Sequence, residues 1–344
     1  MGVTANARAC VIIPDENAGG DMKSYWIVTK GDKATLEQRE VPVPKPKPNE
    51  ILFKVHASAL NRGELTVGGV VHGGPEKNGG NEGAGIVEAV GESVSGFKVG
   101  DRVMGRARGC WADYAIMEVE QALPVPEYMS FEQAAATPLS LITAYEAMVT
   151  YGKVRKGEWV LVAGASSGAG VASIQIAQVL GAKSIGTSGS ADKLTKLKAA
   201  GLDVGIQTRA PDFSSKVREI TGGAGVNLAL NYVGGTYFPE ILKSLANKGR
   251  VAIVGYVDGS HHADIDLSAV HANRFEIFGV SNAKLNAAEK AEATRGFKRD
   301  ILPGYYERRL APLVDRVFRF DELPAAKAHM EANAMVGKIV VRLA

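Results

Sequence analysis

Cysteine is almost absent from this chain of 344 residues, which contains Cys10 and Cys110 and no other. Two thiols build neither the disulfide framework of a small secreted domain nor a four-thiolate zinc site. The apolar run over residues 9–13 is shorter than the core of a secretory signal peptide, and a Pro-Asp-Glu triplet follows it. We therefore expect a reduced, cytoplasmic location.

A large net charge of either sign is also missing. Forty lysines and arginines oppose 37 acidic residues, so the formal net charge is +3. Nucleic-acid-binding proteins usually carry a larger, clustered basic excess, and no nucleic-acid partner is expected here. The apolar fraction of 46% and the charged fraction of 22% are typical of a folded globular protein. Since single cores seldom grow beyond about 300 residues, the length predicts two domains.

Charge is absent altogether from residues 159–182, a stretch long enough to span a bilayer. Its centre, however, reads Gly-Ala-Ser-Ser-Gly-Ala-Gly. A buried strand, a tight turn and a buried helix explain the missing charge without a membrane, because strands of parallel sheets are covered on both faces. We expect no membrane partner.

Glycine, by contrast, is abundant, with 40 residues, and the chain divides into two regions of different periodicity. Short β-like runs bounded by Gly, Pro or Asn fill residues 25–119 and predict a mostly antiparallel β module. After residue 131, segments of helical spacing alternate with short apolar runs at residues 159–163, 184–187, 204–207, 227–232, 251–256 and 275–280. This alternation predicts an α/β fold with a doubly wound parallel sheet.

The two ends of the chain depart from these patterns. Residues 1–21 have no periodicity and are expected to form a loosely ordered extension. Near the C terminus, a helix-like segment over residues 321–333 precedes an apolar strand at residues 338–342. This strand is a candidate to complete the first module, which would then be discontinuous in sequence.

The strongest local motif is the glycine turn Gly164-x-x-x-Gly168-x-Gly170, which joins an apolar strand to an apolar helix. A nucleotide pyrophosphate needs exposed backbone N–H groups at a helix N-terminus with no Cβ in the way, and this arrangement supplies both. The alternative is a tight turn that binds nothing. The position of the turn at the start of the six-strand run favours the dinucleotide site.

The end of the second strand in that run indicates which dinucleotide binds. In NAD-binding proteins, a carboxylate about 20 residues past the glycines bonds to the ribose 2′-hydroxyl and would repel a 2′-phosphate. Ser188 and Ser190 occupy that place here, and Lys193 follows on the next predicted helix. Hydroxyl and ammonium groups pair with phosphate oxygens, which favours NADPH. Asp192 weakens this prediction. The alternative is that Ser190 and Asp192 cap the helix that begins there.

Taken together, the two modules resemble the zinc-free quinone oxidoreductase (zeta-crystallin-like) branch of the medium-chain dehydrogenase/reductase superfamily over residues 22–344. Besides the glycine turn, the resemblance rests on VHASALN (55–61), NEGAGIV (81–87), VGDRV (99–103), WADYA (111–115), TAY (143–145), NYVGG (231–235) and VGKIV (336–340). It implies a GroES-like substrate domain at residues 22–145 and 300–344, and a Rossmann NADPH-binding domain at residues 146–299. It also implies a homodimer that forms through the sheet edge at residues 275–280.

The turn and the resemblance together define the expected cofactor site at the junction of the two domains. Its expected residues are Thr143, Gly164, Ser166, Ser167, Gly168, Ala169, Gly170, Ser188, Ser190, Lys193, Asn231, Gly255 and Lys338.

No metal is expected. In the zinc-dependent members of the superfamily a cysteine stands at the position of Asn61, a histidine at that of Asn81 and a second cysteine close to Leu139. Amides and leucine do not supply the thiolate and imidazole ligands of a catalytic zinc. His261, His262 and His271 form another polar cluster, which is better explained by a surface loop whose Ile265 and Leu267 dock on the sheet.

Without a metal, the expected activity is NADPH-dependent transfer of hydride to a quinone or an α,β-unsaturated carbonyl compound. Asn61 is a candidate donor to the oxygen that gains charge, or else a structural turn residue. Tyr145 is expected beside the nicotinamide, unless it serves packing alone. His72 is a candidate proton donor, or else an exposed loop histidine. Reduction of enoyl or acryloyl thioesters, and a structural or regulatory NADPH-binding role with little turnover, remain alternatives.

Overall fold

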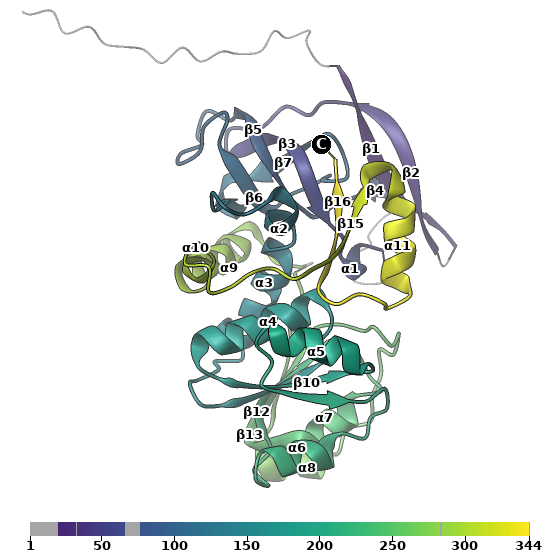
Figure 1. Ribbon diagram of the computed structural model, residues 1–344, viewed down its shortest axis with the longest axis vertical. Helices are drawn as coiled ribbons and strands as arrows, with labels where there is room; N and C mark the ends of the chain where they lie inside the picture. Colours follow the sequence, from purple (N-terminus) through teal and green to yellow (C-terminus); the bar gives the residue numbers. More distant parts are fainter. Residues whose placement is uncertain (1–19, 32, 66–75, 283, 344) are drawn as a thin grey trace, which may run out of the picture.

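The computed structural model describes residues 20–31, 33–65, 76–282 and 284–343, and it contains two modules stacked along the long axis of the molecule (Figure 1). His72 and the expected extension up to residue 19 lie outside the described residues.

The first module contains two β-sheets with antiparallel pairing in most places. A three-stranded sheet has the order β2 (Lys33–Pro42), β1 (Asp21–Lys30) and β4 (Glu76–Asn78). The larger sheet has the order β15 (Val314–Arg319), β16 (Lys338–Arg342), β3 (Glu50–Ala59), β5 (Glu82–Val90), β6 (Arg102–Arg106) and β8 (Ala122–Pro124), and β7 (Tyr114–Glu118) also pairs with β3. The C-terminal strand β16 pairs with β3, so the end of the chain belongs to the same sheet as its beginning.

The second module is a six-stranded sheet in which every neighbouring pair is parallel. Its order is β11 (Val204–Gln207), β10 (Lys183–Ser188), β9 (Trp159–Ala163), β12 (Val226–Asn231), β13 (Leu245–Ile253) and β14 (Glu276–Gly279). The crossovers contain α4 (Gly168–Leu180), α5 (Ala191–Ala199), α6 (Ser214–Ile220), α7 (Phe238–Ser244) and α8 (Leu267–Asn273). The predicted doubly wound sheet is confirmed. The strand order reverses beside β9, and ligands bind such sheets outside the carboxyl ends of the strands at this point.

The charge-free run over residues 159–182 forms β9 and α4 in the middle of this sheet. Ser167 caps α4 by accepting a hydrogen bond from the Gly170 N–H, and Gly181 ends it with a positive φ of 66°. No helix in the described part of the chain is long and apolar enough to cross a membrane.

Helices α3 (Pro138–Tyr145), α9 (Ala287–Asp300) and α10 (Leu302–Tyr306) lie near the junction of the modules (Figure 1). Helix α1 (Arg62–Leu65) follows β3, and α2 (Phe131–Ala135) and α11 (Leu323–Glu331) pack on strands of the first module. Helix α3 packs against α4 of the second module, and α9 packs against both α3 and the short turn Val119–Gln121 of the first module. These contacts fix how the first sheet faces the carboxyl ends of the parallel strands.

The expected docking of Ile265 and Leu267 on the sheet is wrong. Ile265 is 42% exposed and Leu267 is 74% exposed. The Asp266 side chain accepts a hydrogen bond from the Ala269 N–H and so caps α8 immediately before Leu267. Helix α8 buries none of its residues, so the local cap, not apolar burial, decides where these side chains lie.

Candidate active site

A cavity of about 1170 Å³ lies between the two modules. The first module contributes Asn61 and Arg106, and the second contributes residues at the carboxyl ends of β9, β10 and β13. The expected cofactor residues that line it are Thr143, Gly164, Ser166, Ser167, Gly168, Ala169, Ser188, Ser190, Lys193, Gly255 and Lys338. The fold therefore brings most of the expected site together.

At the glycine turn, backbone geometry opens the start of α4 to the cavity. Gly164 has a φ of +83°, and its N–H donates to the Thr187 hydroxyl at 3.2 Å. A Cβ at Gly168 would lie 2.5 Å from the Lys338 side chain. The N–H groups of Gly168 and Ala169 belong to the first helical turn, which has no intrahelical acceptors. Both residues line the cavity, and a helix N-terminus is suited to binding an anion.

Two expected cofactor residues do not line the cavity but support it. A Cβ at Gly170 would lie 2.6 Å from the Ala165 carbonyl oxygen, so this glycine permits close packing of the turn. Asn231 is 1% exposed, and its Oδ1 accepts hydrogen bonds from the backbone N–H groups of Val233 and Gly234. It shapes the loop after β12 that forms part of the cavity wall.

The end of the cavity near β10 contains two cationic side chains. Lys193 donates to the Asn333 carbonyl oxygen at 2.6 Å, a contact that leaves its positive charge without a countercharge. Arg209, which sequence reasoning missed, follows β11 and lies over Gly189, where a Cβ would stand 2.6 Å from the arginine side chain. The Ser188 hydroxyl is buried without a hydrogen-bond partner in the described part of the chain. This end offers donors to an anion.

The opposite end of the cavity contains a short chain of hydroxyl and amide groups. The Thr143 hydroxyl donates to the Leu139 carbonyl oxygen at 2.8 Å and accepts from the Asn282 side-chain amide at 2.6 Å. Asn282 was not identified from the sequence. It follows β14 but bonds to a residue 139 positions earlier, so its place depends on the tertiary fold.

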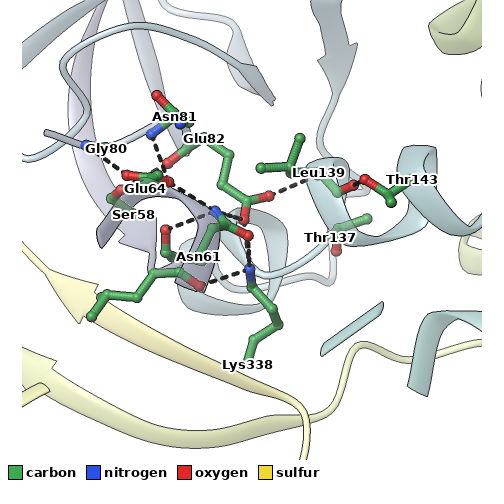
Figure 2. Close-up of polar contacts among 12 residues, drawn as sticks. Ser58, Asn61, Glu64, Gly80, Asn81, Glu82, Thr137, Leu139, Thr143 and Lys338 are labelled. Carbon is green, nitrogen blue, oxygen red and sulfur yellow. Dashed lines mark hydrogen bonds and ion pairs between the residues drawn. The ribbon is translucent and has the colours of Figure 1, made fainter. Parts of the chain in front are cut away.

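Asn61 lies in a buried polar cluster on the cavity wall (Figure 2). Its side-chain nitrogen donates to Glu64 at 3.0 Å and to Glu82 at 2.9 Å, and its oxygen accepts from the Lys338 ammonium at 2.7 Å. Lys338 also donates to Glu82 at 2.7 Å and to the Leu60 carbonyl oxygen at 3.0 Å. Both N–H groups of the Asn61 amide therefore have acceptors inside the protein. This geometry favours the structural role for Asn61 over donation to a substrate oxygen.

Glu64 is the most perturbed acid of this cluster. Burial raises the pKa of its carboxyl from 4.5 to about 7, against the lowering effect of the Asn61 amide and the Lys338 charge. The nearby Glu82 raises it further. Its two oxygens accept hydrogen bonds from the backbone N–H groups of Gly80 and Asn81. Two buried carboxylates and one ammonium thus share the cavity wall.

This pKa makes the stability of the protein depend on pH. Because the folded-state pKa of Glu64 exceeds its unfolded value, the folded state binds more protons between about pH 4.5 and 7. The free energy of unfolding falls as pH rises through that window, by on the order of 3 kcal/mol in total. We expect the midpoint of thermal unfolding of the wild type to fall relative to that of Glu64→Gln over the same window.

Glu146 has to be tested beside Glu64, because burial also raises the pKa of the Glu146 carboxyl to about 7 and adds a second pH-dependent contribution to stability. Glu146→Gln therefore serves as a second variant, and the double variant should lose both contributions. A midpoint difference between wild type and Glu64→Gln that stays constant from pH 4.5 to 8 would show that Glu64 does not titrate in this range.

The three positions that would hold zinc ligands in zinc-dependent relatives converge in the same cluster (Figure 2). The Asn61 amide and the Leu139 N–H both donate to Glu82, and the Asn81 N–H donates to Glu64. The Lys338 ammonium bonds to Asn61 and Glu82 at this point. An amide, an ammonium and an aliphatic side chain do not fit a zinc ion, and no group of three metal-ligating side chains exists among the described residues.

The expected place of Tyr145 in the active site requires correction. Its ring packs against Gly296, and its hydroxyl donates to the Asp300 carboxylate at 2.5 Å. Tyr145 does not line the cavity, whereas Thr143 does. Both belong to α3, and residues two positions apart on a helix point in different directions. Tyr145 therefore joins α3 to α9, which is the packing alternative.

The fold and the cavity define a class of protein. It is a dinucleotide-binding α/β protein with a second, β-rich domain that covers the carboxyl ends of the parallel strands. The alcohol dehydrogenase GroES-like domain model matches residues 47–127, and the zinc-binding dehydrogenase model matches residues 168–296.

Similarities to individual proteins give a more specific assignment than the two domain models. A quinone oxidoreductase of Sus scrofa is 34% identical over 91% of this chain and 95% of its own length. A mycobacterial protein solved in complex with NADPH has a TM-score of 0.84 and 27% identity over 94% of this chain and all of its own. The structure of an NAD-dependent alcohol dehydrogenase has a TM-score of 0.82 and 31% identity, over 94% of this chain and all of its own length. The chain belongs to the quinone oxidoreductase-like medium-chain dehydrogenases/reductases, and it is an oxidoreductase that binds a nicotinamide cofactor.

Proposed function

We propose that the protein transfers hydride from NADPH to a quinone or an α,β-unsaturated carbonyl compound without a catalytic metal. The observation that carries this proposal is the polar cluster of Asn61, Glu82 and Lys338 at the place of a catalytic zinc: an amide and an ammonium replace metal ligands, and the one carboxylate is already bound by both of them. Without a Lewis acid to polarise a carbonyl, an acceptor that is already activated by conjugation is favoured.

The choice of NADPH rests on the end of the cavity near β10. Ser188 stands where NAD-binding proteins place a carboxylate, and Lys193 and Arg209 bring two positive charges to the same end. Ammonium and guanidinium groups form strong charge-assisted hydrogen bonds with phosphate oxygens. Asp192 is exposed on α5 and does not line the cavity, so it opposes such binding only weakly.

The residues of this chain have distinct proposed tasks. The N–H groups at the start of α4 bind the pyrophosphate, and the Thr143–Asn282 pair positions the other end of the cofactor. When bound, NADPH supplies a hydride to an electron-poor carbon. The cluster of Asn61 and Lys338 positions the wall against which the acceptor lies, and His72, outside the described residues, stays a proposed proton donor.

The test is NADPH consumption with a panel of quinones, enones, enals and enoyl thioesters. We expect turnover with quinones or enones. A clear preference for thioesters would support the alternative enoyl- or acryloyl-thioester reductase. NADPH binding without consumption across the whole panel would favour a structural or regulatory protein and would refute the proposed activity.

A zinc-free mechanism makes a separate prediction. The purified protein should contain no stoichiometric zinc by elemental analysis, and its activity should survive prolonged treatment with a chelator, because Asn61, Asn81 and Leu139 offer no thiolate or imidazole. One tightly held zinc ion per chain, together with loss of activity when that ion is removed, would overturn it.

We further propose a homodimer formed through the open edge of the parallel sheet at β14. Ile277 on that strand is 37% exposed, and Leu267 nearby in sequence is 74% exposed. Pairing of two such edges would satisfy backbone groups and cover apolar surface. Sedimentation should give twice the chain mass for the wild type and a monomer for Ile277→Asp. A monomeric wild type at micromolar concentration would contradict this.

A further inference from the structure

A second set of donors faces the cavity beyond the Thr143–Asn282 pair. Arg106 lies at the end of β6 and lines the cavity. Its guanidinium donates one hydrogen bond, to the Asn282 side-chain oxygen at 3.2 Å, and the acids that attract it, Glu146, Glu82 and Glu118, form no ion pair with it. A guanidinium has five N–H donors. Most of the donors of Arg106 therefore remain available to a bound molecule.

Gln121 and Lys290 line the same cavity as Arg106. Gly105 pairs with Ala122, which places Gln121 across from Arg106 on the neighbouring chain segment. Gln121 is 4% exposed, and its side-chain nitrogen has no hydrogen-bond partner among the described residues. Its oxygen accepts from the Thr294 hydroxyl on α9 at 3.4 Å. Lys290, one turn earlier on the same helix, also lines the cavity.

The acidic residues nearby do not neutralise this group. Arg108 already pairs with Glu50 at 2.6 Å, so that pair carries no net charge. Glu118 lines the cavity and offsets one of the two charges of Arg106 and Lys290. Glu146 attracts Arg106 without contacting it, and burial raises the pKa of this carboxyl to about 7, so it is partly protonated near neutral pH. Glu82 also attracts Arg106 but is already paired with Lys338, and no described acid forms an ion pair with Arg106 or Lys290.

From this geometry we propose that the physiological substrate carries a carboxylate, which binds to Arg106, Gln121 and Lys290 while its conjugated carbonyl reacts beside Thr143. Asn282 contacts both Thr143 and Arg106, so the carboxylate lies close to the reacting end of the substrate. A carboxylate would fill the unused donors of a half-buried guanidinium and a buried amide. This inference rests on the proposed reductase function.

The test compares an enone that bears a carboxylate two methylene groups beyond its alkene with the methyl ester of the same compound. The methylenes insulate the reacting carbon, so the two substrates differ at the carboxylate alone. We expect kcat/KM for the acid to exceed that for the ester by about tenfold or more. Arg106→Met should bring this ratio close to one, mainly by raising KM for the acid about ten- to a hundredfold.

Lys290→Gln, at a more accessible position, should lower the ratio in the same direction by a smaller factor. Lys298→Gln makes the same charge change on the exposed face of α9 and should leave the ratio as in the wild type. Equal losses for acid and ester in Arg106→Met would place Arg106 at the reacting oxygen instead and would overturn the carboxylate site. So would a wild-type enzyme that prefers the ester.

Binding of the saturated keto acid to the complex with NADP⁺, measured by calorimetry, separates this inference from the proposed function. Affinity for the acid that exceeds affinity for its ester and depends on Arg106 would support the carboxylate site even if neither enone were reduced. Turnover of the ester by an enzyme whose acid binding does not change in Arg106→Met would keep the reductase function and refute the site.

Discussion

Lys193→Ala and Arg209→Ala should each weaken NADPH binding about ten- to a hundredfold while changing NADH affinity little. Both side chains line the end of the cavity beside Ser188, and neither forms an ion pair with a described residue. Loss of one charge-assisted hydrogen bond to a phosphate costs about 1.5 to 3 kcal/mol. Ser188→Asp should impair NADPH binding further, because it adds a carboxylate next to the 2′-phosphate. Fluorescence titration with both cofactors measures these effects.

The matched control is Lys198→Ala, which removes a lysine from an exposed position of the same helix α5. It should leave both affinities as in the wild type. The three variants could instead weaken the binding of NADPH and of NADH equally. In that case Lys193 and Arg209 do not recognise the 2′-phosphate, and the proposed preference for NADPH loses its basis.

Lys338→Met should destabilise the folded protein by about 3 to 5 kcal/mol, since it removes one partner from a buried ion pair. The Lys338 side chain is 7% exposed and that of Glu82 is fully buried. The substitution would leave Glu82 and Glu64 in the same wall without a countercharge. Chemical denaturation of wild type and variant gives the difference in the free energy of unfolding.

A double variant separates the loss of charge from the loss of packing. Lys338→Met combined with Glu82→Gln should recover a substantial part of the stability, because no unpaired charge remains beside Lys338. A single variant as stable as the wild type would mean that the cluster of Asn61, Glu82 and Lys338 does not hold the cavity wall together.

Much of the parallel sheet is predictable from local sequence. Strands β9 and β11 coincide with the apolar runs at residues 159–163 and 204–207. Strand β9 lies inside the sheet, and strands buried on both faces show uninterrupted apolar character. Strand β13 was less apparent. It begins at Leu245, six positions before the expected start, because the polar segment Asn247-Lys248-Gly249-Arg250 interrupts its apolar pattern.

The candidate site was predictable where the glycine turn or the family resemblance supplied a signal. The glycine turn carries its own signal, because pyrophosphate binding requires small residues at a helix start. Arg106, Asn282 and Gln121 carry no comparable signal, since each acquires its role from a partner far away in the chain. Arg106 and Asn282, for example, are 176 positions apart. Tyr145 differs for another reason: the family resemblance groups it with Thr143, but two positions along a helix point its side chain away from that of Thr143.

The most direct test of the central claim follows the hydride itself. NADPH labelled with deuterium at C4 of the nicotinamide, in each stereoisomer separately, is incubated with the protein and an enone, and the product is examined by mass spectrometry and NMR. One stereoisomer should transfer its deuterium to the β-carbon of the product, with the chelator present throughout. Failure to oxidise NADPH with any enone or quinone, despite measurable NADPH binding, would contradict it.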